Sequence, residues 1–388
     1  MDTNERLAWL QLALTPYIGA ERFLVLLKHF GSASAALNAP ADTIAKLAAH
    51  NQAATAWRDG EKRALAQKAA EAALQWETQA GCRLMLLDDD DFPTMLTEGI
   101  TPPPLLFLRG DVALLHKPAV AIVGSRHATP QAMRIAKDFG KALSEKGIPV
   151  VSGMAAGIDT AAHQGALQAS GGTVTVWGTG IDRIYPPSNR QLAYEIAERG
   201  LIVSEFPLDT RPLAGNFPRR NRLIAALSCA TLVVEAAVES GSLITAKLAA
   251  EMGREVMAVP GSIDNPHSKG CHKLIKEGAK LTECLDDIVQ ECPQLLQNTA
   301  NPSYSINKRR EKVQNETPPR PETPAPVAMP SENVAHPLLD AMGYDPVHPD
   351  TLAQQTGQPA ADVYAVLMEL ELDGIVASLP GGRYQRIS

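Results

Sequence analysis

The spacing of hydrophobic and polar positions divides the chain into a helical part and a part that alternates strands with helices. Residues 7–76 are rich in Ala, Leu and Glu without strand-like alternation, so they are predicted to be helical. The expected strands that follow are residues 120–123, 149–151, 174–177, 201–203, 232–234 and 256–259. The expected helices between them are residues 130–146, 159–169, 188–199, 217–227 and 243–252. This alternation predicts an α/β, Rossmann-like core whose mostly parallel sheet is covered by helices on both faces.

A small domain is predicted at the N-terminal end of this core. Residues 1–83 form the helical domain, and the segment 15–20 followed by Gly31 resembles a helix-hairpin-helix. An ordinary turn between two helices of a bundle also favours glycine for steric reasons, so this alternative stays open. Residues 84–290 form the Rossmann-like domain, and its lead-in, residues 84–110, is expected to be a solvated loop.

The last hundred residues predict a linker and a second small domain. Residues 291–333 are poor in apolar residues and rich in Pro, which indicates a flexible, extended linker. In residues 334–388, the expected elements are a helix at 337–342, a helix capped by Asp350, a helix at 360–372 and strands at 375–378 and 384–387. Three helices followed by a hairpin predict a C-terminal winged helix-turn-helix domain.

Composition indicates an ordinary soluble protein. The chain has 388 residues, of which 45% are hydrophobic and 20% charged. Its five cysteines form no CxxC motif, as expected of reduced thiols in the cytoplasm. No apolar run approaches the roughly 20 residues of a membrane helix, and the polar N-terminus is unlike a secretory signal. We therefore expect a cytoplasmic protein without membrane contact.

The distribution of charge says more about partners than the net charge of −7 does. Residues 116–290 carry 19 basic and 17 acidic groups, and this is the only part of the chain with a positive balance. Residues 334–388 carry two arginines and seven acids. Phosphates would repel such a domain, so the winged helix is expected to bind protein rather than DNA.

Candidate anion-binding turns follow four of the six expected strands. They are Gly124–Arg126, Ser152–Gly157, Gly178–Gly180 and Glu239–Ser242. In α/β sheets, ligands bind beyond the carboxyl ends of the strands. Gly/Ser turns at helix N-termini expose amides that can hold phosphate. Steric requirements of the turn can explain glycine at any one of these positions. Several glycine-containing turns on the same edge of the sheet favour a role in ligand binding.

The segment 216–222 adds three arginines and an aromatic residue at a helix start. Cations oppose the helix dipole there, so a phosphate ligand explains them better than helix stability does. Phe217 could stack on a base. The alternative is that the arginines pair with nearby acids and that Phe217 belongs to the core.

Other chemistry is not indicated. The chain lacks the GxGxxG and GxxxxGK[ST] motifs, so neither a dinucleotide cofactor nor P-loop ATP hydrolysis is expected. The cluster His267, Cys271 and His272 is a poor metal site, and no metal is expected. His163, Glu205 and Glu235 are expected to be structural, so we expect no enzyme.

The motifs of the core resemble those of the DNA-processing protein A family (DprA, also called Smf). The matching stretches are Val120–Arg126, Ser152–Asp159 with His163, Gly178–Asp182 with Tyr185, Pro186 and Asn189, Ser204–Pro207, Phe217–Ile224, Glu235 with Ser240–Ala246, and Ala258–Gly261. They recur in order through nearly all of residues 105–280. The resemblance implies a homodimer that binds single-stranded DNA, protects incoming DNA in natural transformation and loads the RecA recombinase.

The candidate DNA-binding residues come from these stretches. They are Gly124, Ser125, Arg126, Ser152, Gly153, Met154, Gly157, Asn216, Phe217, Arg219, Arg220, Asn221, Arg222, Ser240, Gly241, Ser242 and Lys247. The sequence departs from the family pattern at Pro187-Ser188, where some members carry a lysine, and at His272, where an asparagine is common.

Two other functions remain open from sequence. A nucleotide phosphoribohydrolase shares this kind of core, but it would need a Gly-Gly-x-Gly-Thr turn where this chain has Ser240-Gly-Ser-Leu. A winged-helix transcription factor would place duplex DNA on residues 334–388.

Overall fold

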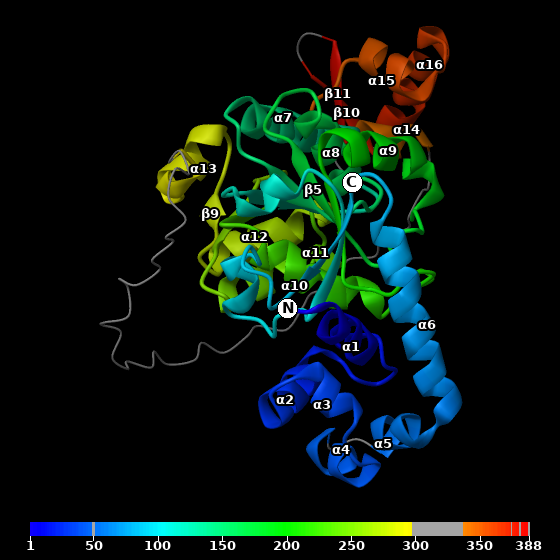
Figure 1. The fold of residues 1–388 in the computed structure, drawn as a ribbon. Coiled ribbons are helices and arrows are strands. Elements are labelled where there is room, and N and C mark those ends of the chain that lie inside the picture. The colour runs from blue at the N-terminus through cyan, green and yellow to red at the C-terminus, as the bar shows by residue number, and fades with distance from the viewer. Residues whose placement is uncertain (49–50, 297–336, 374, 380–381, 387–388) are drawn as a thin grey trace, which may run out of the picture.

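The chain folds into a helical N-terminal part, an α/β core and a small winged-helix domain (Figure 1). The computed structural model describes residues 1–48, 51–296, 337–373, 375–379 and 382–386. The N-terminal helices are α1 (Thr3–Ala13), α2 (Ala20–Phe30), α3 (Ala33–Leu37), α4 (Ala41–Ala48), α5 (Asn51–Arg58) and α6 (Gly60–Glu77). As predicted, Gly31 ends α2, and its φ of 78° is the left-handed conformation that glycine adopts most easily.

A nine-stranded sheet forms the core, in the order β1-β2-β6-β5-β4-β3-β7-β8-β9. The strands are β1 (Cys82–Leu86), β2 (Leu105–Gly110), β3 (Val120–Val123), β4 (Val150–Ser152), β5 (Thr173–Trp177), β6 (Leu201–Ser204), β7 (Ala230–Val233), β8 (Glu255–Ala258) and β9 (Lys280–Leu281). In that spatial order, all neighbouring strands from β6 through β5, β4, β3, β7 and β8 to β9 pair in parallel. The predicted Rossmann-like sheet is therefore confirmed, and the six expected strands lie within two residues of their predicted bounds.

The prediction of a solvated loop at residues 84–110 was wrong. This segment supplies β1 and β2, which extend the parallel sheet with two antiparallel strands. Leu106 and Leu108 are fully buried in that extension. The acid run that suggested a loop, Asp88–Asp91, lies between the two strands.

Helices cover both faces of the sheet, as the apolar strands predicted. They are α7 (Pro130–Glu145), α8 (Ile158–Ala166), α9 (Arg190–Arg199), α10 (Asn216–Ala226), α11 (Gly241–Glu251), α12 (Lys269–Lys276) and α13 (Leu285–Glu291). One apolar cluster joins α10, α11 and α12 to the sheet, and a second joins α7, α8 and α13 to the other face. Beyond the carboxyl ends of β3, β4 and β5 the chain continues as loops at one edge of the sheet.

The N-terminal helices are attached to the core through β1 and β2. The indole Nε1 of Trp9 donates to the carbonyl of Pro104 at 2.8 Å. The rings of Trp76 and Phe107 lie 5.5 Å apart, and both belong to the apolar cluster that also contains the α1–α6 side chains. The antiparallel extension of the sheet is thus the platform on which the N-terminal part packs.

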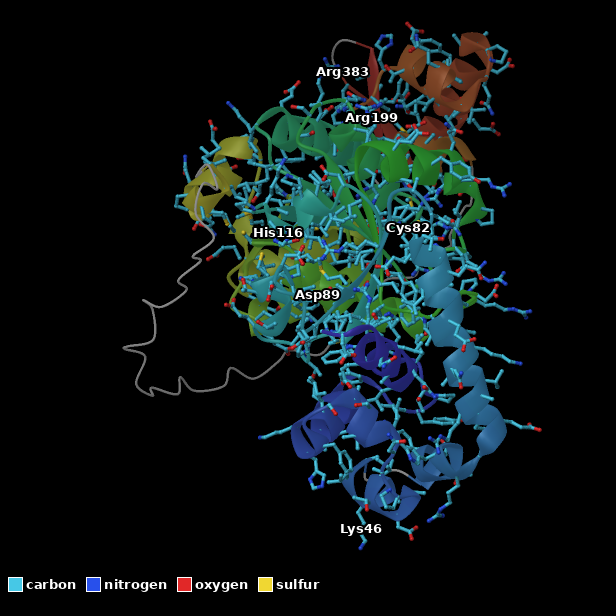
Figure 2. All side chains as sticks on the ribbon, in the orientation of Figure 1. Lys46, Cys82, Asp89, His116, Arg199 and Arg383 are labelled. Carbon is cyan, nitrogen blue, oxygen red and sulfur yellow. The ribbon has the colours of Figure 1, made fainter. Side chains whose placement is uncertain are left out.

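The winged-helix domain has its own apolar core. It consists of α14 (Pro337–Met342), α15 (Pro349–Thr356), α16 (Ala360–Leu372), β10 (Val376–Leu379) and β11 (Arg383–Arg386), which agrees with the predicted pattern. The predicted cap was wrong: His348 Nδ1 accepts from the amide of Asp350, so His348 is the N-cap of α15. Figure 2 shows Arg383, at the start of β11, at the opposite end of the molecule from the N-terminal helices.

Two remaining expectations concern the linker and the membrane. The predicted linker was wrong for residues 291–296: Glu291 ends α13, Cys292 and Leu295 are buried in the core, and Pro293–Leu296 forms a short 3-10 helix. Residues 297–333 of the predicted linker lie outside the described residues. Within the described ranges, every helix is too short or too polar to cross a membrane.

Candidate nucleic-acid interface

Three loops converge beyond the carboxyl ends of β3, β4 and β5. A Cβ placed on Gly157 would lie 2.3 Å from the carbonyl oxygen of Ser125, so the first two loops touch. A Cβ on Gly178 would lie 2.8 Å from the ring of Phe217, so the start of α10 packs on the third loop. The structure thus brings together the predicted segments 124–126, 152–157 and 216–222.

Arg220 fills the space beneath these loops. Its side chain is buried, and only 4% of the residue is exposed. Its guanidinium donates to the carbonyl of Gly153 at 2.7 Å and to the carbonyl of Val176 at the end of β5. A Cβ on Gly153 would lie 2.7 Å from the same guanidinium, which explains the glycine there by close packing. Arg220 therefore ties two loops together from below.

Asp159 is the counter-charge of this buried arginine. Its Oδ2 accepts from the amides of Gly153 at 3.1 Å and Ala155 at 3.3 Å. Burial raises the pKa of Asp159, and the nearby positive charge of Arg220 opposes that rise. Burial likewise lowers the pKa of Arg220 to about 10, and Asp159 counters the shift. Arg220 still carries its charge at neutral pH.

His163 completes the buried group and is structural, as predicted. Its Nδ1 lies 2.8 Å from Thr173 Oγ1, which in turn donates to the carbonyl of Val150. Burial, aided by the charge of Arg220, lowers the pKa of His163 to about 3. The ring is therefore neutral at physiological pH. We call Asp159, His163 and Arg220 the floor of the site.

Above this floor lie three exposed or half-exposed side chains, Arg126, Tyr185 and Phe217, which we call the rim. The guanidinium carbon of Arg126 is 5.6 Å from the centre of the Phe217 ring, a cation–π distance. The Tyr185 ring lies 5.5 Å from Phe217, and Tyr185 is 42% exposed. Phe217 is half-buried and Arg126 exposed. The rim thus offers a cation and an aromatic face to solvent.

The backbone of the loop after β4 is held in an uncommon conformation. Met154 has a φ of 62°, which costs a residue other than glycine energy and occurs often at functional sites. The buried amide of Asn189 donates to the Met154 carbonyl at 2.9 Å and to Thr160 Oγ1 at 2.8 Å. Asn189 thereby stabilises a loop shape that the local sequence disfavours.

Several groups expected to hold phosphate have partners within the protein. The amide of Ser125 donates to the main-chain carbonyl of Glu235 at 2.7 Å, and the hydroxyl of Ser152 donates to the main-chain carbonyl of Ile122 at 2.6 Å. Among the described residues, no acceptor meets the amides of Met154 and Gly157. Met154 is only 1% exposed, so of the two only the amide of the half-buried Gly157 is available to a ligand.

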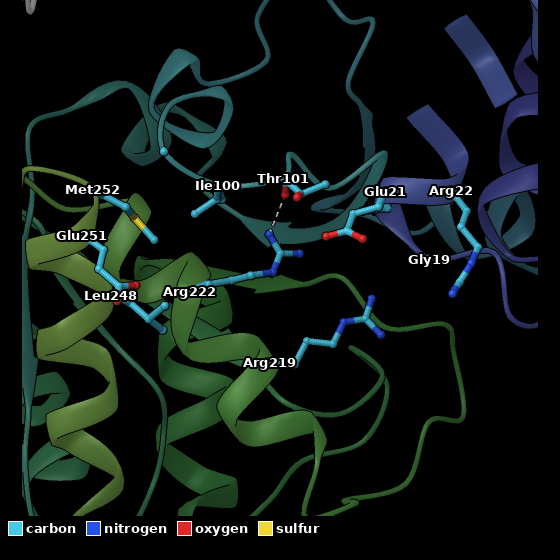
Figure 3. Close-up of a pocket in the computed structure, with 12 residues that line it drawn as sticks. Gly19, Glu21, Arg22, Ile100, Thr101, Arg219, Arg222, Leu248, Glu251 and Met252 are labelled. Atoms are coloured by element: carbon cyan, nitrogen blue, oxygen red, sulfur yellow. Dashed lines mark hydrogen bonds between the residues drawn. The ribbon is translucent and has the colours of Figure 1, made fainter. Parts of the chain in front are cut away.

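The other arginines of α10 face a different surface. Arg222 pairs with Glu205 and donates to the carbonyl of Thr101 at 2.9 Å. Arg219 approaches Glu205 at 3.4 Å and stays half exposed. Figure 3 shows both arginines in a cleft of about 360 Å³ that Gly19 and its neighbours close from the N-terminal part. Pairing with a local acid, the alternative noted from sequence, therefore holds for Arg222 and also for Arg219.

The asparagines of the same segment have structural surroundings. Asn221 Oδ1 accepts from Arg220 Nε at 3.2 Å. Asn216 Nδ2 is buried, and no acceptor meets it within the described residues. Their roles in DNA binding stay predictions.

The residues predicted on α11 lie apart from the rim. Ser240 and Lys247 line a cleft between α11 and α12, together with Lys273. Ser242 is buried, and its amide donates to the Ser240 hydroxyl at 3.3 Å, while Gly241 begins the helix. α11 also packs directly against α10, the helix that carries Phe217 of the rim.

Glu235 is structural, as expected. Its carboxylate accepts from the amide of Thr129 at 3.1 Å and from the Thr129 hydroxyl at 2.8 Å. The two departures from the family pattern also have local roles. Pro187 begins a short 3-10 helix, and His272 Nε2 lies 3.0 Å from the carbonyl of Gly261.

Sequence reasoning omitted Tyr185 and Asn189 from the candidate set. Both lie in a stretch that matched the family motifs, and that match was the only signal available. Their contacts with Phe217 and Met154 join residues about 30 positions apart, which no local pattern reveals.

Comparison with known proteins finds three matching family domains. Residues 83–293 match DNA recombination-mediator protein A, residues 3–57 the DprA-like N-terminal HHH domain and residues 320–382 the DprA winged helix domain. Protein Smf of Escherichia coli K12 is 40% identical over 321 residues, covering 81% of this chain and 80% of that protein.

Two further relatives come from Streptococcus pneumoniae. DNA processing protein DprA of strain R6 is 46% identical over 203 residues, covering 52% of this chain and 72% of that protein. The X-ray structure of DNA processing protein A from this species superposes with a TM-score of 0.63 at 36% identity, covering 75% of this chain and 98% of the other.

Proposed function

Because the chain belongs to the DNA recombination-mediator protein A family, we propose that it binds single-stranded DNA at the rim formed by Arg126, Tyr185 and Phe217. One observation carries the proposal: an exposed guanidinium lies beside a half-exposed aromatic ring, 5.6 Å away, above a loop in which no acceptor among the described residues meets the Gly157 amide. Single-strand binders combine such a cation for the phosphate with an aromatic face for a base.

The proposed binding mode divides the contacts between backbone and base. Arg126 and the amide of Gly157 would contact phosphate oxygens, which gives affinity without sequence preference. Phe217, supported by Tyr185, would stack on a base that a duplex keeps inside its helix. Single strands are therefore preferred.

We propose that this binding is not coupled to catalysis. The titratable groups under the rim, Asp159 and His163, are buried and bonded to protein groups. A proton acceptor for a reaction must reach the substrate directly or through one water molecule. The floor instead shapes the loops.

The wider role proposed for the protein rests on its family. The chain would act in the cytoplasm, protect incoming single strands during natural transformation and load the RecA recombinase onto them. A test with both proteins would follow the rate at which RecA covers a strand already coated by a single-strand-binding protein. Acceleration by the wild type and none by an Arg126→Ala variant is expected.

We also propose that the protein is a homodimer. The face of α11 and the edge strand β9 expose the apolar side chains of Ile244 and Leu281, at 45% and 41%. Exposed apolar side chains beside a free strand edge are typical of an interface. Leu281→Asp should convert the dimer to a monomer in sedimentation analysis, whereas Met133→Asp on the exposed part of α7 should not.

The experiment that tests the main proposal is titration of labelled oligonucleotides at several salt concentrations. Single strands should bind more tightly than duplexes, and affinity should fall as salt rises because phosphate contacts release counterions. Arg126→Ala should weaken binding to all sequences and reduce the salt slope by about 0.7, one phosphate's share. Arg134→Ala, an exposed arginine on α7, is the matched control. Equal affinity for duplex and single strand across the salt range would contradict the proposal.

A further inference from the structure

A polar cleft of about 570 Å³ separates the core from the winged-helix domain. The core lines it with His127, Thr129 and His267. The winged-helix domain lines it with Asp340, Gly343, Tyr344 and Arg386. His127 and Thr129 belong to the same loop as Arg126 of the rim. The winged-helix domain therefore lies against residues 127–129, beside the proposed DNA site, as its place beside α7 in Figure 1 illustrates. We call the surface of residues 127–129 the Thr129 shoulder.

The approach between the two domains is close. A Cβ built on Gly343 would lie 3.8 Å from Thr129 Cγ2 and 3.9 Å from Thr129 Cβ, which is van der Waals contact. Arg126 precedes Thr129 by three residues, so their Cα atoms lie at most about 11 Å apart. Any strand that follows the Arg126 loop toward α7 meets the winged-helix domain.

Charge makes this neighbour unfavourable for DNA. The winged-helix domain carries seven acids against Arg383 and Arg386. Asp340 is exposed and lines the cleft together with Arg386, opposite two histidines of the core, so the negative charge belongs to the domain as a whole rather than to the cleft. At physiological salt the screening length is about 8 Å, so the acids of the domain repel those phosphates that come within about that distance of them.

We propose that the winged-helix domain docks on the Thr129 shoulder as an intramolecular competitor of single-stranded DNA. This inference rests on the proposed function, because it takes the Arg126 loop as the DNA site. The domain occupies the path of the strand and supplies negative charge in its place. The surface of residues 127–129 is thus a docking surface for an acidic domain of the same chain.

The consequence for affinity follows from the docked fraction. If DNA binds only when the domain has left the shoulder, the apparent affinity equals the intrinsic affinity multiplied by the undocked fraction. A partner that captures the winged-helix domain would therefore strengthen DNA binding without touching the rim. The acidic charge of the winged-helix domain leads us to expect that it binds protein. In this proposal the first protein surface that it binds is the core of the same chain.

A reversible covalent lock tests the inference in the full-length chain. The 3.9 Å separation of the two Cβ positions lies within the about 3.5–4.5 Å that a disulfide spans. Thr129→Cys combined with Gly343→Cys should therefore form a disulfide with oxidised glutathione, identifiable by peptide mass spectrometry. The matched control pairs Thr129→Cys with Gly357→Cys, since Gly357 shares the positive φ but has no neighbour within 4 Å.

The readout is affinity for a labelled single strand, oxidised and then reduced. We expect the oxidised lock to bind at least tenfold more weakly than its own reduced form, and the control pair to show no such difference. Failure of the lock to form, or a locked protein that binds as well as the reduced one, would overturn the inference. If the reduced and wild-type proteins bind no single strand, the proposed function fails instead.

Discussion

The two halves of the site, the floor and the rim, each contain one arginine, and the two arginines lie in opposite settings. Arg220 in the floor and Arg126 in the rim both lie about 6 Å from the Phe217 ring, at 6.0 and 5.6 Å. Arg220 is buried and donates to two main-chain carbonyls, whereas Arg126 is exposed. The difference teaches that the buried charge maintains the shape of the loops and that the exposed charge is free to meet a ligand.

The largest effect should come from breaking the floor. Arg220→Met leaves Asp159 buried without its counter-charge, which typically costs about 3–5 kcal/mol. We expect a loss of that size in the free energy of unfolding, measured by denaturant titration with tryptophan fluorescence. Single-strand binding should fall as well, because the loops after β4 and β5 lose their common anchor.

The control for this prediction is the neighbouring residue. Arg219→Met removes a half-exposed guanidinium whose ion pair should contribute about 1 kcal/mol or less. If both variants lose similar stability, the distinction between a structural and a solvent-facing arginine is wrong at this helix.

Acid should weaken the floor through His163. The pKa of this histidine is lowered to about 3 in the folded protein, whereas an unfolded histidine titrates near about 6.5. Between these values the unfolded chain binds more protons, so stability falls as pH falls. The loss from this group between pH 7 and pH 5 is about 2 kcal/mol, at about 1.4 kcal/mol per pH unit.

The measurement compares unfolding free energies at pH 7 and pH 5. His163→Asn retains a polar atom near Thr173 but no ring that titrates, so its pH dependence should be smaller by that amount. His116→Asn, at an exposed site, should behave as the wild type. An unchanged pH dependence in His163→Asn would show that the ring is not the group that titrates.

Substitutions in the rim should lower the affinity for single-stranded DNA rather than the free energy of unfolding. Phe217→Ala should weaken single-strand binding by about 1–3 kcal/mol, the range for one stacked base. The salt slope should stay unchanged, because stacking releases few counterions. Tyr194→Ala, another exposed aromatic residue on α9, should change neither quantity.

Thermal unfolding decides whether Phe217 belongs to the rim or to the core. An unfolded Phe217→Ala protein would favour the alternative from sequence, in which the ring supports the fold. A folded protein with weakened binding and an unchanged salt slope would sharpen the division between floor and rim.

Much of this arrangement could be predicted from sequence, because continuous apolar runs mark buried parallel strands. The same reasoning missed β1 and β2: the acid run Asp88–Asp91 dominates that segment, and its antiparallel pairing with β6 joins distant residues. The Gly/Ser turns were visible because each follows a strand.

The division of the arginines could not be predicted. Arg219, Arg220 and Arg222 look alike in sequence, and only the fold decides that one is buried under two loops and another pairs with Glu205. Tyr185 reaches Phe217 from a separate loop, so no spacing rule links them. Sequence supplied the residues, but burial assigns their roles.

The smallest effect should come from the part of the predicted site that lies apart from the rim. Lys247 is 77% exposed, its ammonium is 3.8 Å from Glu251, and it lines the cleft between α11 and α12. Lys247→Ala should leave single-strand affinity within about twofold and the salt slope unchanged, because no phosphate contact is lost. Oligonucleotide titration at low and moderate salt, beside Arg126→Ala, measures both. A slope reduced by about 0.7 would instead mean that the strand runs on across α11. The binding surface would then include Ser240 and Lys247, as the sequence predicts, and the rim would be only its first half.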